Sequence, residues 1–271
     1  MTIRKLISAV IITALFPLVA FSQKDKKSTV KDTREYVDLG LPSGTLWATC
    51  NIGASKPEEY GLYFAWGETD GYTSDTSDGH YFDAKNHKWW SYGGKDPVLT
   101  KYCSSMHRGK IDNKFELDPE DDAATVIWGN KWEMPSSDQV GELCDSSYTI
   151  SEWTTLNGVR GKKITSKKNG KSIFLPAAGF RTESWKGAFK SVGFYWSRTI
   201  YNGDFNAYCL IFDKAGIECY AIPRHNGICI RPVRSPKNKK KAKQEITEGD
   251  AMVVPIEDDQ LIIIQSEPDE K

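Results

Sequence analysis

The sequence lacks an excess of charge of either sign. Across its 271 residues, 36 Lys and Arg balance 36 Asp and Glu, so the formal net charge is zero. Surfaces that bind nucleic acid or anionic membranes depend on an excess of Lys and Arg. The balance disfavours both kinds of partner, and we expect no nucleic-acid ligand.

The sequence also lacks the short motifs of the common hydrolases and zinc proteins. It contains no G-x-S-x-G, H-E-x-x-H, C-x-x-C or H-x-x-x-H, and its only histidines are His80, His87, His107 and His225. An isolated loop histidine is more often a surface residue than a general base. We therefore assign no catalytic residue, no metal ligand and no cofactor, and we keep an enzyme of unknown chemistry as the alternative to a binding protein.

The residues that are present are typical of a globular domain rich in β-sheet. Hydrophobic residues make up 39% of the chain and charged residues 27%, which disfavours both a disordered chain and a protein with several membrane spans. Nine Trp, twelve Tyr and eleven Phe favour strands with bulky cross-strand packing and loops lined by aromatic side chains.

Residues 1–22 have the pattern of a cleaved secretory signal peptide. A basic start precedes an apolar stretch over residues 6–20, and small residues stand at the two positions that signal peptidase reads. A membrane-spanning helix needs about 20 apolar residues, and Pro17 shortens this stretch further. No cysteine follows for lipid attachment. We expect a secreted, periplasmic or cell-surface protein with no transmembrane span after cleavage.

Export would bring the cysteines into a compartment that tolerates disulfides. The six are Cys50, Cys103, Cys144, Cys209, Cys219 and Cys229. Six cysteines allow fifteen pairings, and the sequence does not choose among them. A local argument exists only for Cys209 and Cys219, which flank a turn at residues 213–216 and could face one another across a hairpin. The alternative is that most of the six are small, buried apolar side chains.

The domain is expected over residues 36–234, after a polar, lysine-rich lead-in at residues 23–35 that is typical of a flexible segment. Pro42 and Gly44 fit a turn between two extended stretches, which predicts a hairpin that opens a sheet. Residues 235–271 form a charged tail with six Lys and nine Asp and Glu, which is typical of disorder. The alternative for the tail is that its apolar patch at residues 261–264 adds to a sheet edge on this or another chain.

Two stretches inside the domain depart from regular strand patterns. An S-x-x-E pattern at residues 55–58 predicts one helical turn before a strand at residues 62–66. Residues 69–117 mix polar residues with aromatics and predict a long, irregular excursion, which the aromatics indicate is ordered.

The second half of the domain predicts two helices and several strands. Asp118, followed by Pro119, predicts one helix start, and the S-x-x-Q spacing from Ser136 predicts another. Asn169-Gly170 predicts a hairpin between two short strands. Further short strands are expected at residues 194–199, 206–212, 217–222 and 228–233. The fold class predicted is α+β, with two helices, a mainly antiparallel multi-stranded sheet and a long irregular loop region.

Seven sequence blocks of the domain occur in a recognisable order. They are YVDLGLPSGTLWAT (36–49), YFAWGE (63–68), LDPEDDAA (117–124), WEMPS (132–136), FLPAAG (174–179), YWS (195–197) and RPV (231–233). In this order they resemble the Fibrobacter succinogenes major paralogous domain family. The resemblance implies an exported bacterial surface domain with a C-type-lectin-like fold, related to the formylglycine-generating sulfatase-modifying factors. It implies little about activity.

Two activities associated with that fold lack their residues here. C-type lectins bind calcium through E-P-N or Q-P-D followed by W-N-D on the long loop, and neither occurs in the domain. The sulfatase-modifying reaction needs a closely spaced cysteine pair, whereas the last three cysteines are ten residues apart. The acidic residues Asp118, Glu120, Asp121 and Asp122 could offer oxygen ligands to a cation, but helix capping explains them better.

The candidate ligand-binding residues are three aromatics of the excursion, Trp89, Trp90 and Tyr92. Flat rings stack on sugar faces and anchor protein interfaces. The alternative is that Trp89 and Trp90 fasten the long loop to the domain; Trp185 is a weaker second candidate. We expect an exported binding module for a carbohydrate or a surface protein, with a structural role in a surface assembly as the third hypothesis.

Overall fold

The computed structural model describes residues 33–92, 97–183, 185–202 and 205–236. The expected signal peptide, most of the lead-in and nearly all of the charged tail lie outside these residues. Among the described residues, no helix is long and apolar enough to cross a membrane.

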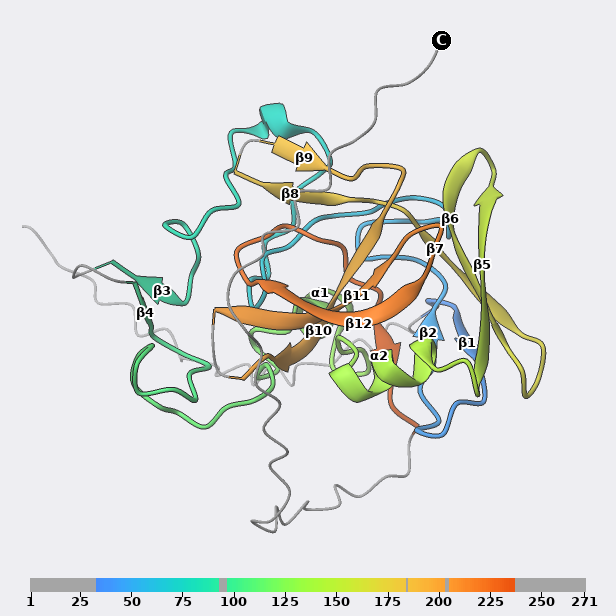
Figure 1. Cartoon of the computed structure of the whole chain (residues 1–271), viewed down its shortest axis with the longest axis horizontal. Helices are drawn as coiled ribbons and strands as arrows, with labels where there is room; N and C mark the ends of the chain where they lie inside the picture. Colours follow the sequence, from blue (N-terminus) through green and yellow to red (C-terminus); the bar gives the residue numbers. More distant parts are fainter. Residues whose placement is uncertain (1–32, 93–96, 184, 203–204, 237–271) are drawn as a thin grey trace, which may run out of the picture. The chain divides into compact units, whose positions relative to one another are not determined.

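The two ends of the domain meet in one antiparallel sheet. Its strands, in the order β1-β2-β13, are β1 (Tyr36–Asp38), β2 (Leu46–Ala48) and β13 (Val233–Arg234). The turn predicted at Pro42 and Gly44 is confirmed, since the Gly44 N–H donates to the Leu41 carbonyl at 2.9 Å. Pairing of β13 with β2 closes the domain on itself (Figure 1).

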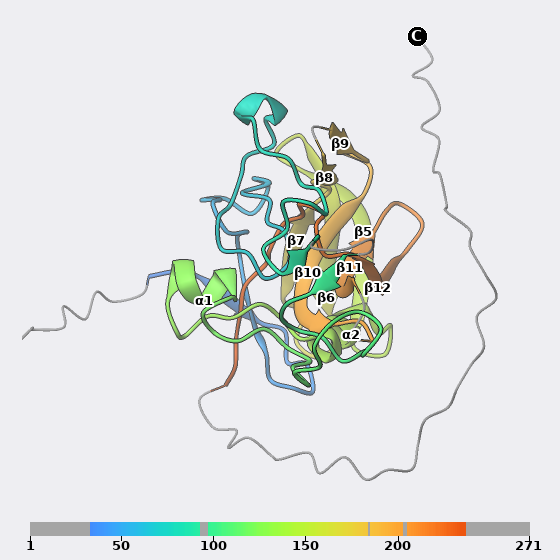
Figure 2. The ribbon, with the colours of Figure 1, turned by 90° about the vertical axis from the view of Figure 1, so that its left-hand side faces the viewer.

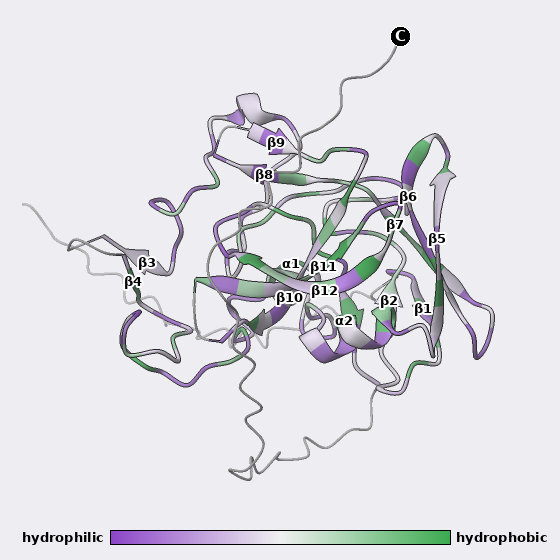
Figure 3. Ribbon diagram, in the orientation of Figure 1, coloured by the Kyte–Doolittle hydropathy of each residue, from purple (hydrophilic) through white to green (hydrophobic). Residues whose placement is uncertain are grey.

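A second antiparallel sheet lies at the centre of the domain. Its strands, in sequence order, are β10 (Gly193–Ile200), β11 (Asn206–Phe212) and β12 (Ile217–Pro223). The predicted hairpin between β11 and β12 is confirmed, with the Asp213 N–H donating to the Gly216 carbonyl at 3.2 Å. Figure 3 shows apolar and polar residues mixed along these strands, as expected of a sheet with one face turned to the core.

A third antiparallel sheet carries the predicted Asn-Gly turn. Its strands are β5 (Thr149–Leu156), β6 (Val159–Ser166) and β7 (Ser172–Pro176). Gly170 has a φ of 72°, and its N–H donates to the Ser166 carbonyl at 3.0 Å. Asn169 keeps a negative φ, so the turn is longer than the two-residue type that the dipeptide predicts.

The remaining regular elements are short. They are η1 (Thr76–Asp78), β3 (Trp90–Ser91), β4 (Val98–Leu99), β8 (Phe180–Thr182), β9 (Trp185–Gly187), α1 (Ala123–Trp128) and α2 (Ser137–Cys144). The predicted α+β class with two α-helices therefore holds for the described residues. The strands are divided among several small antiparallel sheets rather than one large one.

The two helix starts that the sequence predicts have different outcomes. The capping box at Ser136 is confirmed, because Ser136 and Gln139 exchange side-chain and backbone hydrogen bonds at the start of α2. The start predicted at Asp118 is wrong, because α1 begins four residues later with Asp122 as its N-cap. The carboxylate of Asp118 instead binds lysine side chains of the excursion.

Two other local predictions need correction. Residues 55–58 form no helix, and Ser55 pairs with Glu59 rather than Glu58, its N–H donating to the Glu59 carboxylate at 2.7 Å. The strands expected at residues 62–66 and 228–233 are reduced to single bridges, such as Phe64 with Ile228, beside the two residues of β13.

The six cysteines are all free thiols in the structure. A Cys209–Cys219 pair is wrong, because Cys209 lies opposite Tyr220 and Cys219 lies opposite Leu210 in the β11–β12 ladder. Neighbouring positions of a strand point to opposite faces, so the two thiols lie on different sides of the hairpin.

Two adjoining clusters of buried side chains make up the core. One packs α2 against β11 and β7 through residues such as Leu143, Leu210 and Leu175. The other surrounds the fully buried rings of Trp66 and Trp196. Each indole N–H of these two rings donates to a backbone carbonyl at 2.8 Å, so the rings are satisfied as well as buried. Figure 2 shows the helices and strands around this core from a second direction.

Candidate functional site

The excursion, residues 69–117, runs from η1 past β3 and β4, in turquoise and green in Figure 1. It has little regular secondary structure, as predicted. Backbone hydrogen bonds nevertheless hold it to the domain at both ends, and a further one within the excursion orders its middle. The Tyr72 N–H donates to the Tyr63 carbonyl at 2.9 Å, Thr100 to Trp89 at 2.9 Å, and Leu117 to Arg198 at 3.0 Å.

A buried arginine anchors the first part of the excursion. The guanidinium of Arg181 is fully buried and forms a bidentate pair with the Asp78 carboxylate at 2.8 and 3.0 Å. It also donates to the carbonyls of Thr73 and His80, at 2.8 and 3.1 Å. These hydrogen bonds from Arg181 lower the pKa of Asp78. Bidentate pairing fixes both position and orientation, so residues 73–80 are held against β8.

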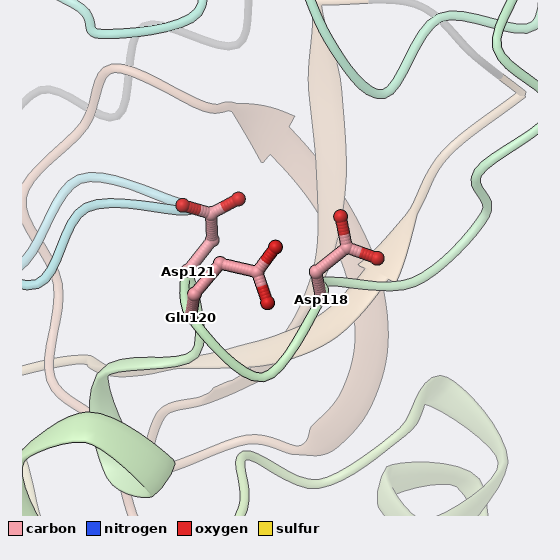
Figure 4. Close-up of side chains that lie close together, drawn as sticks. All are labelled: Asp118, Glu120 and Asp121. Carbon is pink, nitrogen blue, oxygen red and sulfur yellow. The ribbon is translucent and has the colours of Figure 1, made fainter.

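A cluster of carboxylates and lysines anchors the second part. Figure 4 shows Asp118, Glu120 and Asp121 close together, and one oxygen from each lies within 4.8 Å of the others. The Lys101 Nζ lies 2.6 Å from Asp118 Oδ2 and 2.5 Å from Asp121 Oδ2. Lys88 reaches the other oxygen of Asp121 at 3.0 Å, so the buried carboxylate is paired twice.

This pairing determines the direction in which the pKa values of the two aspartates shift. Burial alone would raise the pKa of Asp121, but the hydrogen bonds from Lys101, Tyr102 and Lys88 outweigh it, and the pKa is lowered. The pKa of Asp118 is lowered by Lys101 and Lys114. The ammonium groups occupy the position that a cation would take between these carboxylates. The cluster therefore acts as a structural clamp between the excursion and the segment before α1.

Trp89 is part of the same clamp. Its indole N–H donates to the Gly67 carbonyl at 3.1 Å, and its ring meets the Tyr102 ring edge-on, with the centroids 5.7 Å apart. The ammonium groups of Lys88 and Lys101 lie 4.4 and 5.0 Å from the Trp89 ring centroid. A Cβ at Gly67 would lie 2.8 Å from the indole nitrogen, so the contact requires glycine there. These contacts match the alternative in which Trp89 fastens the loop.

Trp90 and Tyr92 lie in different surroundings. The Trp90 ring packs within 4.6 to 5.4 Å of the rings of Phe205, His87 and His225. The buried Trp90 Nε1 and His225 Nδ1 have no hydrogen-bond partner among the described residues. Tyr92 is 44% exposed. The three candidate rings therefore do not form one exposed platform, and their contact with a ligand stays a prediction.

His87 has a structural role in this arrangement. It is buried, and burial lowers its pKa to about 3, so the imidazole is neutral at physiological pH. The Nε2–H donates to the Trp66 carbonyl at 3.0 Å, and Nδ1 accepts from the Trp89 N–H at 3.3 Å. The Nε2 contact therefore joins the excursion to the core, and the Nδ1 contact fixes the backbone of the excursion itself.

The anchored excursion carries six exposed large apolar side chains among its described residues. They are Tyr81, Tyr92, Val98, Met106, Ile111 and Phe115. Met106 is 75% exposed and Phe115 51%. Sequence reasoning considered only flat rings and missed Val98, Met106 and Ile111. Their signal was an apolar residue in a polar stretch without strand or helix periodicity.

The fold and these contacts define an α+β domain that holds an irregular excursion against its core by buried charge pairs and rings. Comparison with known proteins adds no name to this description: no protein-family model, no curated protein and no solved structure matches the chain.

Proposed function

We propose that the chain is an exported binding module that recognises a partner protein through the excursion. The observation that carries this proposal is the combination of firm anchoring and apolar exposure. Met106, Ile111 and Phe115 are exposed, although the segment that carries them is held by Lys101 and Lys114, which both pair with Asp118. Loops held on a rigid scaffold commonly carry binding residues, and a contiguous exposed apolar patch on such a loop marks an interaction surface.

A protein partner is favoured over a carbohydrate at this surface. Sugar binding uses flat rings with a free face, and the rings of Trp89 and Trp90 are engaged in packing. The exposed set is mixed, since it includes Val98, Met106 and Ile111 as well as the rings of Tyr92 and Phe115. Methionine and aromatic residues are enriched in protein interfaces.

Anchoring of the excursion also lowers the entropic cost of binding. A loop that becomes ordered only on binding loses conformational entropy, which reduces affinity. Here the backbone on either side of the exposed residues is already fixed, since the Leu99 N–H donates to the Arg108 carbonyl at 2.6 Å and Asp112 to Cys103 at 2.9 Å. The surface is therefore presented in one arrangement.

The proposal includes export from the cytosol and a C-type-lectin-like fold. The pattern of residues 1–22 supports export, and the product would be secreted, periplasmic or held at the cell surface. The meeting of β1, β2 and β13, the two helices and the long excursion support a C-type-lectin-like arrangement of the major paralogous domain type.

The experiment compares two triple variants that remove similar amounts of exposed apolar surface. The excursion variant is Met106→Ser, Ile111→Ser and Phe115→Ser. The control variant is Val126→Ser, Ile150→Ser and Tyr220→Ser, three exposed positions elsewhere in the domain. The mature wild-type chain is first screened on arrays of secreted and surface proteins and of glycans, and thermal melts confirm that both variants fold.

We expect a protein ligand whose Kd rises at least tenfold with the excursion variant and changes little with the control, because central apolar anchors dominate interface energies. Equal binding by both variants, or a screen in which only glycans bind, contradicts the proposal.

A further inference from the structure

Two open hollows lie between the first strand, β1, with the residues that follow it, and the turn that joins β6 to β7. None of their lining residues belongs to the excursion. The first, of about 380 Å³, is lined by Gly40, Pro42, Ser147, Tyr148, Lys167 and Lys168. The second, of about 450 Å³, is lined by Tyr36, Val37, Asp38, Gly170, Lys171 and Ser172. Both volumes fall in the range of roughly 300–1,000 Å³ that is typical of small-molecule sites.

Hydrogen bonds fix the two segments that meet between the hollows. The Asn169 side-chain amide donates to the Asp38 carbonyl at 2.9 Å, which joins the turn to the edge strand β1. The Ser166 hydroxyl accepts the N–H groups of Lys168 and Asn169 at 3.1 and 3.2 Å, which fixes the turn itself. Gly40 has a φ of 63°, and the Lys168 Cδ lies 3.0 Å from the position of a Cβ there. The aliphatic stem of Lys168 therefore lies on Gly40.

The charge of the site is positive. Lys167, Lys168 and Lys171 are exposed, and none of them takes part in the ion pairs found among the described residues. One carboxylate, that of Asp38, lines the second hollow, and it accepts the Gly40 N–H at 2.7 Å. The first hollow thus has two ammonium groups and no acidic lining residue, and the second has one group of each sign.

Each hollow also has an aromatic ring and a hydroxyl group. Tyr148 in the first hollow is 40% exposed, and Tyr36 in the second is 47% exposed. Ser147 and Ser172 supply the hydroxyl groups. The Tyr148 ring offers a flat apolar face for a sugar. The Tyr36 ring already meets the Trp132 ring edge-on, with the centroids 6.5 Å apart, and has the Arg234 guanidinium 5.1 Å from its centroid. Carboxylate and hydroxyl oxygens pair with sugar hydroxyls.

We propose that this double hollow binds an acidic polysaccharide, with a carboxylate- or sulfate-bearing sugar unit in the first hollow and a neighbouring unit in the second. The Lys167 and Lys168 ammonium groups pair with the acid, and Tyr148 packs on the sugar ring. Asp38 and Ser172 accept or donate hydrogen bonds to hydroxyls of the next unit. The site is separate from the excursion and does not depend on the function proposed for it.

An acidic polysaccharide is favoured over a small free anion and over an acidic peptide. A small free anion would use the first hollow only and leave the second unexplained. An acidic peptide would meet the Asp38 carboxylate in the second hollow, where like charge is unfavourable, and it has few hydroxyls to offer.

The experiment measures binding of the mature chain to four probes at low and at physiological salt. Polygalacturonate carries carboxylates, dextran sulfate carries sulfates, neutral dextran carries no charge, and polyglutamate carries carboxylates without sugar. We expect binding of polygalacturonate or dextran sulfate that weakens with salt, with the stronger of the two showing which acid is recognised, and much weaker binding of dextran and polyglutamate.

Three variants assign the binding to the hollows. Lys167→Gln, Lys168→Gln and Lys171→Gln together should weaken binding by about tenfold or more, since the charge-assisted contacts of Lys167 and Lys168 and the neighbouring charge of Lys171 are lost. The matched control, Lys85→Gln, Lys131→Gln and Lys214→Gln, removes the same charge at exposed positions elsewhere and should change binding little. Tyr148→Leu should weaken binding without changing its salt dependence.

The proposal is overturned if neither acidic polysaccharide binds, if polyglutamate binds as tightly as they do, or if both lysine variants lose affinity equally. The serine variant of the excursion should keep full polysaccharide binding, so a failure here is distinguishable from a failure of the protein-binding proposal. A thermal melt of each variant shows that the fold is retained.

Discussion

At the scale of single residues, charged side chains hold the excursion in place through hydrogen bonds and ion pairs. Asp121 is 2% exposed, yet it accepts from Lys88, Lys101 and Tyr102 at 2.5 to 3.0 Å. Removing one partner of a buried charge network leaves the other charges uncompensated, which costs more than the net contribution of the pair.

We expect Asp121→Ala to lower the free energy of unfolding by about 3 kcal/mol, because Lys101 and Tyr102 lose a buried acceptor. Glu120→Ala is the matched control, since its side chain is 69% exposed and lies 3.8 Å from Lys101. The control should change stability by less than about 0.5 kcal/mol. Urea denaturation of both variants measures the difference, and equal effects would show that the clamp adds nothing.

The partly buried thiols of Cys144 and Cys219 lead to a second prediction at this scale, for alkaline pH. Burial raises the pKa of Cys144 from 9.0 to about 12 and that of Cys219 to about 11. In the unfolded chain these thiols ionise near pH 9, whereas in the folded chain they stay protonated. Their contribution to stability is therefore complete below pH 9 and is lost as the pH rises toward 11 and 12.

We expect the melting temperature to fall between pH 9 and pH 11, and to fall less steeply in a Cys144→Ala, Cys219→Ala double variant. Cys50→Ala serves as the control, because Cys50 belongs to neither core cluster. Thermal melts over this range check the prediction. An identical slope in the wild type and the double variant would refute it.

At the scale of elements, three local signals predicted structure that is found, whereas the local S-x-x-E signal at residues 55–58 did not produce a helical turn. The three are the capping box at Ser136 and the hairpin turns at Gly44 and Gly170. The helix start at Asp118 failed for a non-local reason. Several acidic residues there can cap a helix, and Lys101 and Lys114 from the excursion engage Asp118, while Asp122 caps α1.

The register of strand pairing, like the helix start at Asp118, could not be predicted from local sequence. The sequence predicts the β11–β12 hairpin, but which residues face each other depends on a one-residue choice that moves every side chain to the other face. That choice separates Cys209 from Cys219. The division of the strands into small sheets also depends on contacts between distant segments, such as β13 with β2.

The capping box gives a prediction for an element. Ser136→Ala removes the side-chain acceptor of the Gln139 N–H and should cost about 1 kcal/mol of stability. Ser137→Ala, one position later, is the control, because no hydrogen bond of its hydroxyl is found in the described part of the chain. Denaturant titration of the two variants should therefore give clearly different midpoints. Equal midpoints would mean that the cap contributes nothing to the stability of α2.

At the scale of the whole molecule, the chain combines a closed domain with two separate surfaces. One is the apolar excursion, and the other is the lysine-bearing double hollow beside β1. The sequence predicted that the excursion exists, that it is ordered and that it is rich in aromatics. It could not predict which rings face solvent, because the partners of Trp89 and Trp90 come from residues 67, 102, 205 and 225.

Hydrogen exchange of the mature protein, alone and in complex with the protein partner found by array, tests the central claim most directly. The account predicts slow exchange in the free protein at the amides of Leu99, Thr100, Asp112 and Leu117, all of which are hydrogen-bonded. It also predicts further slowing over residues 98–115 in the complex, with no change over residues 147–172. Exchange of the excursion at the rate of an unfolded chain, or protection confined to another surface, would contradict it.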